Sequence, residues 1–185
     1  MNILSIHGFR VRDGGARSVD TFAGVLMFRG HHVDMDSADY GFHHLLKVRW
    51  FHKSAVKRIA KALDTADCVY CHSNGANYLF QALTINPKPV KVILLSPALD
   101  ADADIPECIT ELHVFHTMHD KAVRAARWLL WHPWGEMGRV GYTGNDKRVT
   151  NYDHSDRVGH HSGWFVGLNR LYFAARVAEI CENED

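Results

Sequence analysis

One serine stands where its side chain could act as a nucleophile. Ser73 lies in the sequence Cys-His-Ser-Asn-Gly at 71–75, between an apolar run at 67–72 and a helix-like run at 74–85. A serine between a strand and a helix, with small residues two places before and after it, predicts a tight turn that exposes the hydroxyl. Cys71 replaces the glycine that is usual at the first of these places. A serine hydroxyl is a weak nucleophile at neutral pH, so it needs a base, and that base needs an orienting carboxylate.

The candidate carboxylate follows another apolar run of the chain. Asp120 comes after the run at 112–116, and sites in a parallel sheet form where strands end at their carboxyl termini. The other interpretation of Asp120 is a helix N-cap. Asp100 and Asp102 are alternative acids, but with Asp104 they are more typical of a solvated loop.

The candidate base is a histidine late in the chain. His160 and His161 stand just before the last predicted helix, at 163–181, and we favour His161 because Ser162 and Gly163 then open that helix. His160 remains a rival, and His154 ranks third.

Residues at the predicted turn and after the first strand are candidates for the substrate site and for the oxyanion donors. His72 adjoins Ser73, but neighbours at a sharp turn project in different directions, so we assign it with Gly8 to the substrate site rather than to the base. The backbone N–H of Asn74, at a helix start, and that of Phe9, after the first strand, are candidate oxyanion donors.

The elements that must position these residues alternate along the chain. Apolar runs predict strands at 2–7, 32–36, 67–72, 90–96 and 112–116, with another short strand near 148–152. Helical spacing predicts helices at 19–29, 53–64, 74–85, 123–130 and 163–181. The apolar face of the last one comprises Trp164, Leu168, Leu171, Tyr172, Ala175 and Ala178. This alternation predicts a single-domain α/β fold, a three-layer α/β/α sandwich with a mostly parallel sheet of five to six strands.

Composition narrows the classes of function. The 185 residues predict one domain over 1–185, with 46% hydrophobic and 23% charged residues. Formal net charge is zero, so we expect neither nucleic acid nor a membrane surface as partner. No apolar run approaches the ~20 residues that cross a bilayer, and no secretory signal is recognisable, so we expect a cytoplasmic protein. Oligomeric state stays open.

The cysteines and histidines raise two alternatives. Cys68 and Cys71 form a C-x-x-C pair, but its place in a strand favours buried free thiols over redox or zinc chemistry. His31-His32, His43-His44 and His160-His161, with His116 and His119, admit a metal-dependent hydrolase, although none of these pairs has recognisable ligand spacing.

Together these pieces resemble a small α/β-hydrolase. The matching segments, in the family's order, are 6–9, 71–76, 95–97, 119–123 and 159–162. The resemblance implies a Ser-His-Asp triad, no metal or cofactor, and hydrolysis of a small-molecule ester, thioester or amide through an acyl-enzyme. Within that family, the chain is most similar in type to serine esterases and lipases.

The sequence departs from the family in the covering of the site. The stretch after Ser96 leaves little room for a helical cap, so we expect a minimal cap or none. Aromatic stretches at 40–46 and 128–134 could cover the site or pack in the core. A non-catalytic relative that binds rather than cleaves is the alternative function.

Overall fold

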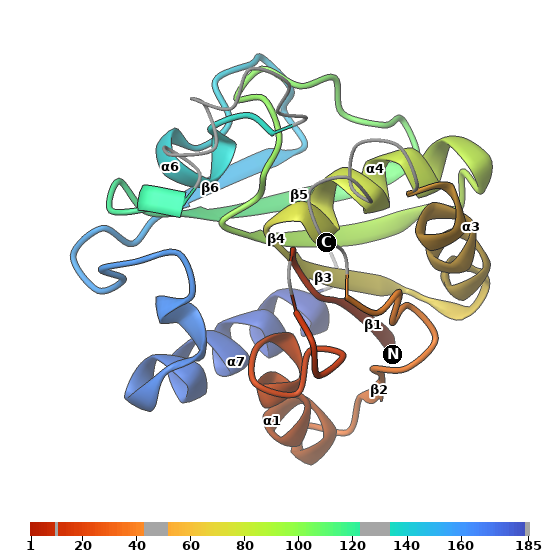
Figure 1. The fold of residues 1–185 in the computed structure, drawn as a ribbon, viewed down its shortest axis with the longest axis horizontal. Helices are drawn as coiled ribbons and strands as arrows, with labels where there is room; N and C mark the ends of the chain where they lie inside the picture. Colours follow the sequence, from red (N-terminus) through yellow and green to blue (C-terminus); the bar gives the residue numbers. More distant parts are fainter. Residues whose placement is uncertain (10, 43–51, 123–133, 184–185) are drawn as a thin grey trace.

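A single parallel sheet organises the chain. The computed structural model describes residues 1–9, 11–42, 52–122 and 134–183. Six strands pair in the order β2-β1-β3-β4-β5-β6, and every neighbouring pair is parallel (Figure 1). The strands are β1 (Asn2–Ile6), β2 (His32–Asp34), β3 (Cys68–His72), β4 (Val90–Leu95), β5 (Ile109–His116) and β6 (Val149–Asp153).

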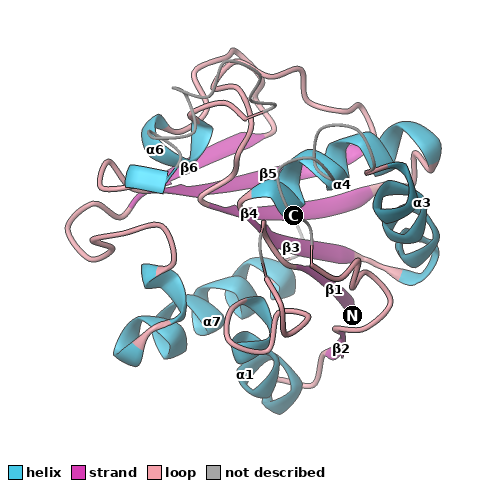
Figure 2. Ribbon diagram, viewed as in Figure 1, coloured by secondary structure: helices cyan, strands magenta, loops and turns pink. Residues whose placement is uncertain are grey.

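Helices cover both faces of this sheet (Figure 2). One face carries α3 (Lys53–Ala62) and α4 (Asn74–Ile85), and the other carries α1 (Ala23–Phe28) and α7 (Gly167–Glu182). The shorter elements are η1 (Val19–Phe22), η2 (Leu63–Thr65), α6 (Met137–Val140) and η3 (Gly163–Phe165). The predicted three-layer α/β/α fold is therefore confirmed, with six strands.

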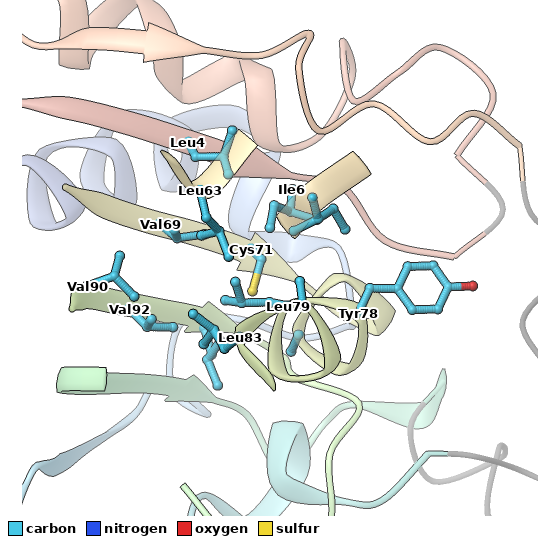
Figure 3. Packing of buried hydrophobic residues seen from close by; sticks show 14 of the residues in the cluster. Leu4, Ile6, Leu63, Val69, Cys71, Tyr78, Leu79, Leu83, Val90 and Val92 are labelled. Carbon is cyan, nitrogen blue, oxygen red and sulfur yellow. The ribbon is translucent and has the colours of Figure 1, made fainter. Parts of the chain in front are cut away.

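Two hydrophobic cores lie on opposite faces of the sheet. Successive side chains of a strand point to opposite faces, so Val69 packs toward α3 and α4 while Tyr70 packs toward α1 and α7. Figure 3 shows the first core, where Leu79 and Leu83 of α4 lie over the strands. Central parallel strands are buried on both faces, and this explains why their sequences are continuous apolar runs.

Most predicted elements appear with small shifts, and two expectations need comment. The predicted helix at 19–29 begins instead as η1, and the Ser18 side chain bonds the carbonyl of Gly15 rather than capping the helix. The predicted helix at 123–130 lies outside the described residues. Residues 96–108, between β4 and β5, contain no helix.

The expected buried face of the last helix is partly wrong. Leu168 is 82% exposed and Leu171 is 50% exposed, whereas Phe173 and Val177 are fully buried. Trp164 is buried as expected, but it lies in η3, before the α-helix begins at Gly167. The break at Val166 shifts the helical phase, which turns the leucines outward.

The C-x-x-C pair lies within β3 and its two thiols face different cores. Cys71 packs with α4, whereas Cys68 packs toward α7, where its Sγ lies 3.1 Å from that of Cys181. All four cysteines are free, and only Cys108 is partly exposed. Burial raises the pKa of the Cys71 thiol well above its ordinary value. The expectation of buried free thiols is confirmed.

Helix length and hydropathy also bear on membranes. In the part of the chain that the structure describes, no helix combines the length and apolar character needed to cross a bilayer.

Thiol accessibility provides a test of this packing. In the native protein, we expect Ellman's reagent to modify Cys108 alone, because the other three thiols are buried. Cys108→Ser should then abolish the fast reaction, while urea should expose the remaining thiols. Rapid modification of a second thiol in native Cys108→Ser would contradict this packing.

Candidate active site

Ser73 occupies a strained turn between β3 and α4. Its backbone has φ 55° and ψ −124°, a conformation that costs a non-glycine residue of order 1–3 kcal/mol. Neighbouring backbone holds the turn in place. The Ser73 N–H donates to the Leu95 carbonyl at 3.1 Å, and the Ser73 carbonyl accepts from the Ala98 N–H at 3.1 Å. The geometry is that of a nucleophile elbow, in which a strained serine stands at the carboxyl end of a central strand.

Two glycines allow other backbone to approach this turn. A Cβ on Gly75 would lie 2.7 Å from the carbonyl oxygen of His7, and a Cβ on Gly8 would lie 3.0 Å from the Cβ of Ser73. Only glycine therefore lets α4 and the loop after β1 pack against the elbow without displacing it.

Cys71 is accommodated because its side chain points away from the turn. It is fully buried beneath α4 in the first core, beside Ile6 and Leu94 of the adjacent strands (Figure 3). A small thiol thus stands where the elbow motif has glycine, and the strained serine conformation is present beside it.

The candidate acid and base form a short hydrogen bond. The Nδ1 of His161 lies 2.7 Å from the Oδ2 of Asp120, whose side chain is fully buried, whereas the His161 side chain is 19% exposed. A carboxylate at Nδ1 selects the tautomer that leaves Nε2 free to accept a proton.

The two loops that carry this pair are bonded to each other. The Thr117 hydroxyl donates to the Val158 carbonyl at 2.6 Å, and the Met118 N–H donates to the Ser155 hydroxyl at 2.9 Å. Because Thr117 lies three residues before Asp120 and Val158 three before His161, this bond fixes the spacing of acid and base.

His72 connects the serine turn to the base loop. Its Nε2–H donates to the carbonyl of His161 at 3.1 Å, and the two rings lie 4.6 Å apart. Burial, followed by the nearby charge of His161, lowers the pKa of His72 to about 3, so its ring is neutral at physiological pH. His72 thus bonds the base loop, and its assignment to the substrate site stays a prediction.

The candidate oxyanion residues share one neighbour. The Trp134 indole N–H donates to the Asn74 side-chain oxygen at 2.6 Å, and the Trp134 ring lies 5.0 Å from that of Phe9. Asn74 is the first residue of α4, where backbone N–H groups have no partner within the helix. Trp134 therefore bridges the two segments from which we expect the oxyanion donors.

The rival candidates lie elsewhere. His160 is exposed, and Asp100 and Asp102 lie on an exposed loop. His154 packs against Phe115 and Phe173, and burial lowers its pKa. No group of three or more potential metal ligands is present among the described residues, and the His43-His44 pair lies outside them.

Sequence reasoning missed several residues that hold the site. Thr117 gave no signal beyond its place before Asp120. Tyr40 and Trp134 belonged to the two aromatic stretches, which we interpreted as cover or core. The rest of those stretches, 43–46 and 128–133, lies outside the described residues. Tyr40 instead bonds the carbonyls of His7 and Gly8.

Comparison with known proteins finds a similar fold among solved structures. No family model matches the chain, and no curated protein matches it. It is similar to the crystal structure of a novel pyrethroid hydrolase from Sphingobium faniae JZ-2, with a TM-score of 0.59 and 14% identity over 98% of this chain and 97% of that one.

A second solved structure is an extracellular alpha/beta-hydrolase from a Paenibacillus species, said to share structural and functional homology with tobacco salicylic acid binding protein 2. Its TM-score is 0.43 at 15% identity, over 70% of this chain, which spans 50% of the length of that protein. At 14% identity, the likeness to the Sphingobium faniae hydrolase concerns the fold alone, a parallel sheet flanked by helices on both faces.

Adding a methyl group at Gly75 tests the close approach at the elbow. We expect Gly75→Ala to lower the free energy of unfolding by about 1–3 kcal/mol, because the methyl meets a backbone carbonyl that cannot move aside. Gly24→Ala in α1 is the matched control, since no atom lies within 4 Å of its added Cβ. Helix propensity should make that control neutral or stabilising by up to about 1 kcal/mol. Equal urea midpoints for the two variants would contradict the crowding.

The buried neutral His72 predicts a pH dependence of stability. The unfolded chain takes up a proton at His72 near 6.5 and the folded chain only near 3, so its contribution to stability is complete above 6.5 and falls as pH drops through this window. Urea unfolding of His72→Gln should therefore show a weaker loss of stability on acidification. Exposed His32→Gln should keep the original slope. An unchanged slope in His72→Gln would show that this ring is protonated in the folded protein.

Proposed function

We propose that the protein is a serine hydrolase that cleaves a carboxylic ester, thioester or amide through an acyl-enzyme on Ser73. The observation that carries the proposal is the buried Asp120–His161 pair, linked through His72 to a serine in a strained strand-to-helix turn. A structural ion pair alone would not account for the strain at Ser73.

In the proposed reaction, His161 Nε2 takes the proton of the Ser73 hydroxyl as its oxygen attacks the acyl carbon. Asp120 keeps the His161 Nδ1 proton in place and stabilises the imidazolium that forms. The backbone N–H groups of Phe9 and Asn74 receive the developing oxyanion. His161 then protonates the leaving group, and a water molecule repeats the sequence to release the acid and free Ser73.

The substrate proposed is a small molecule. Phe9 and Trp134 form an aromatic pair beside the elbow, which suits an apolar acyl or aryl group. A cytoplasmic location remains part of the proposal. The alternative is a binding protein that keeps the fold without turnover, and the experiments below separate the two.

The nucleophile is tested first. We expect a fluorophosphonate probe to label Ser73 and to block hydrolysis of short p-nitrophenyl esters, because a serine activated by His161 is nucleophilic. Ser73→Ala should lose both labelling and hydrolysis, whereas EDTA should leave both unchanged. Absence of labelling and turnover in the unmodified protein would favour the binding alternative, and loss with EDTA would favour a metal-dependent hydrolase.

The base is tested by two neighbouring histidines. His161→Gln should lower kcat at least about 10³-fold, because the proton acceptor is removed. His160→Gln should stay close to the parent, since its exposed side chain lies outside the pair with Asp120. Circular dichroism controls for folding. The reverse ranking would assign the base to His160.

A further inference from the structure

A second histidine, His7, is buried at the oxyanion side of the site with both ring nitrogens engaged. Its side chain is 2% exposed, its Nδ1 lies 3.0 Å from the carbonyl oxygen of Gly8, and its Nε2 lies 3.1 Å from the Oδ1 of Asp39. A carbonyl oxygen and a carboxylate oxygen both only accept hydrogen bonds from a ring N–H. A neutral imidazole has one N–H, so it can satisfy one of these contacts but not both.

The surroundings of His7 favour the charged ring. Asp39 faces it directly, and the Asp39 carboxylate also accepts from the Gly41 N–H at 2.7 Å. Burial opposes ionisation of Asp39, but these two hydrogen bonds outweigh it and lower the pKa of that carboxyl group.

The other ionisable groups near His7 are few among the described residues. Asp20 lies on the α1 side, where burial raises its pKa to about 6 and the charge of His7 partly offsets that rise. His72 carries no charge. Arg58 approaches Asp39 from α3, donating to its backbone carbonyl. The Tyr40 ring lies 4.0 Å from the His7 ring and is tilted against it by 32°, and burial raises the pKa of its hydroxyl, which keeps its proton.

The Gly8 carbonyl depends on His7 for its hydrogen bond. The Tyr40 hydroxyl lies 2.7 Å from the carbonyl oxygen of His7 and 3.0 Å from that of Gly8, but it has a single proton to donate. The nearer acceptor is the carbonyl of His7, and Tyr40 cannot serve both carbonyls with one proton, so the His7 Nδ1–H is a second donor within reach of the Gly8 carbonyl.

The orientation of that carbonyl sets the orientation of the next N–H. The described residues contain no cis peptide bond, so the Gly8 C=O and the Phe9 N–H point in opposite directions from one planar unit. The carbonyl points to His7 and Tyr40, and the Gly8 Cα lies against Ser73. The Phe9 N–H is thereby turned away from His7 and Tyr40.

We propose that His7 is an imidazolium and a positioning residue, whose two N–H groups clamp the Gly8 carbonyl to Asp39 and so aim the Phe9 N–H at the oxyanion formed on Ser73. The oxyanion role of Phe9 rests on the proposed function. The clamp, meaning the two hydrogen bonds from the His7 ring to Gly8 and Asp39, does not depend on that function.

The clamp gives activity an alkaline limit. As pH rises, His7 loses one proton. Asp39 retains the Nε2 proton because it is the charged acceptor, so the Nδ1 bond to Gly8 is lost. Loss of this bond should lower kcat/KM on the alkaline side of the pH profile, which we call the alkaline limb.

The protonation state is measured without reference to activity. In protein labelled with ¹⁵N-histidine, a long-range ¹H–¹⁵N spectrum at about pH 8, where an unperturbed histidine is neutral, should show one ring with both nitrogens protonated. His7→Gln assigns that ring by removing it, and His32→Gln should leave it. A His7 ring with a single N–H at this pH overturns the proposal, even if Ser73 proves to be the nucleophile.

The positioning role is measured by ester hydrolysis. His7→Gln should lower kcat about 10–100-fold with KM unchanged, part of the ~10²–10³-fold that loss of an oxyanion donor costs, and should abolish the alkaline limb. Asp39→Asn keeps an acceptor but removes the counter-charge, so the alkaline limb should move to lower pH while kcat at its plateau is kept. It serves as the test if His7→Gln fails to fold.

The outcomes separate the two proposals. Ser73 labelling with a parent-like pH profile in both His7→Gln and Asp39→Asn would overturn the clamp and leave the hydrolase proposal standing. A doubly protonated His7 in a protein that neither reacts with the probe nor turns over esters would overturn the hydrolase proposal and the oxyanion role together.

Discussion

The close backbone approach between the elbow and the end of β1 is the constraint on which the site depends. A Cβ on Gly75 would lie 2.7 Å from the His7 carbonyl oxygen, and a Cβ on Gly8 would lie 3.0 Å from the Cβ of Ser73. This contact holds the loop after β1 beside the start of α4, so two segments that are distant in sequence lie next to each other at the Ser73 turn. The strained conformation of Ser73 persists because the structure around it leaves no room to relax.

The remaining parts of the site come from the other side of β3. The sheet order puts β1 on one side of β3 and β4 and β5 on the other, so the candidate oxyanion loop after β1 and the candidate acid after β5 lie on opposite sides of Ser73. His72 and Thr117 bond the base loop to these strands, at the carbonyls of His161 and Val158. Each functional side chain thus stands on a loop held by hydrogen bonds to its neighbours, and such loops lose little conformational freedom when substrate binds.

Much of this arrangement was predictable from the sequence, because its signals are local. Continuous apolar runs predicted buried parallel strands, and a serine between a strand and a helix predicted the elbow. The order Ser73, Asp120, His161 followed from the places where strands end. Cys71 was an unsettled departure, and the alternation of side chains in β3 explains why it is tolerated.

The parts that escaped prediction depend on contacts between distant residues. His7 and Asp39 are 32 positions apart, and Trp134 and Asn74 are 60 apart, with no spacing rule to connect them. The face of α7 was misassigned for a different reason. The helix begins at Gly167, after an extended Val166, and its phase is set by where it begins rather than by the number of leucines in it.

The separation of the hydrophobic interior by the sheet has a consequence for how the protein can vary. Cys71, Ala76 and Trp134, which support the nucleophile side, belong to the core under α3 and α4. Val158, Trp164 and Phe165, which support the base loop, belong to the core under α1 and α7. The candidate nucleophile and the candidate base thus rest on separate hydrophobic layers, and the His72 bond to the His161 carbonyl is a link between them.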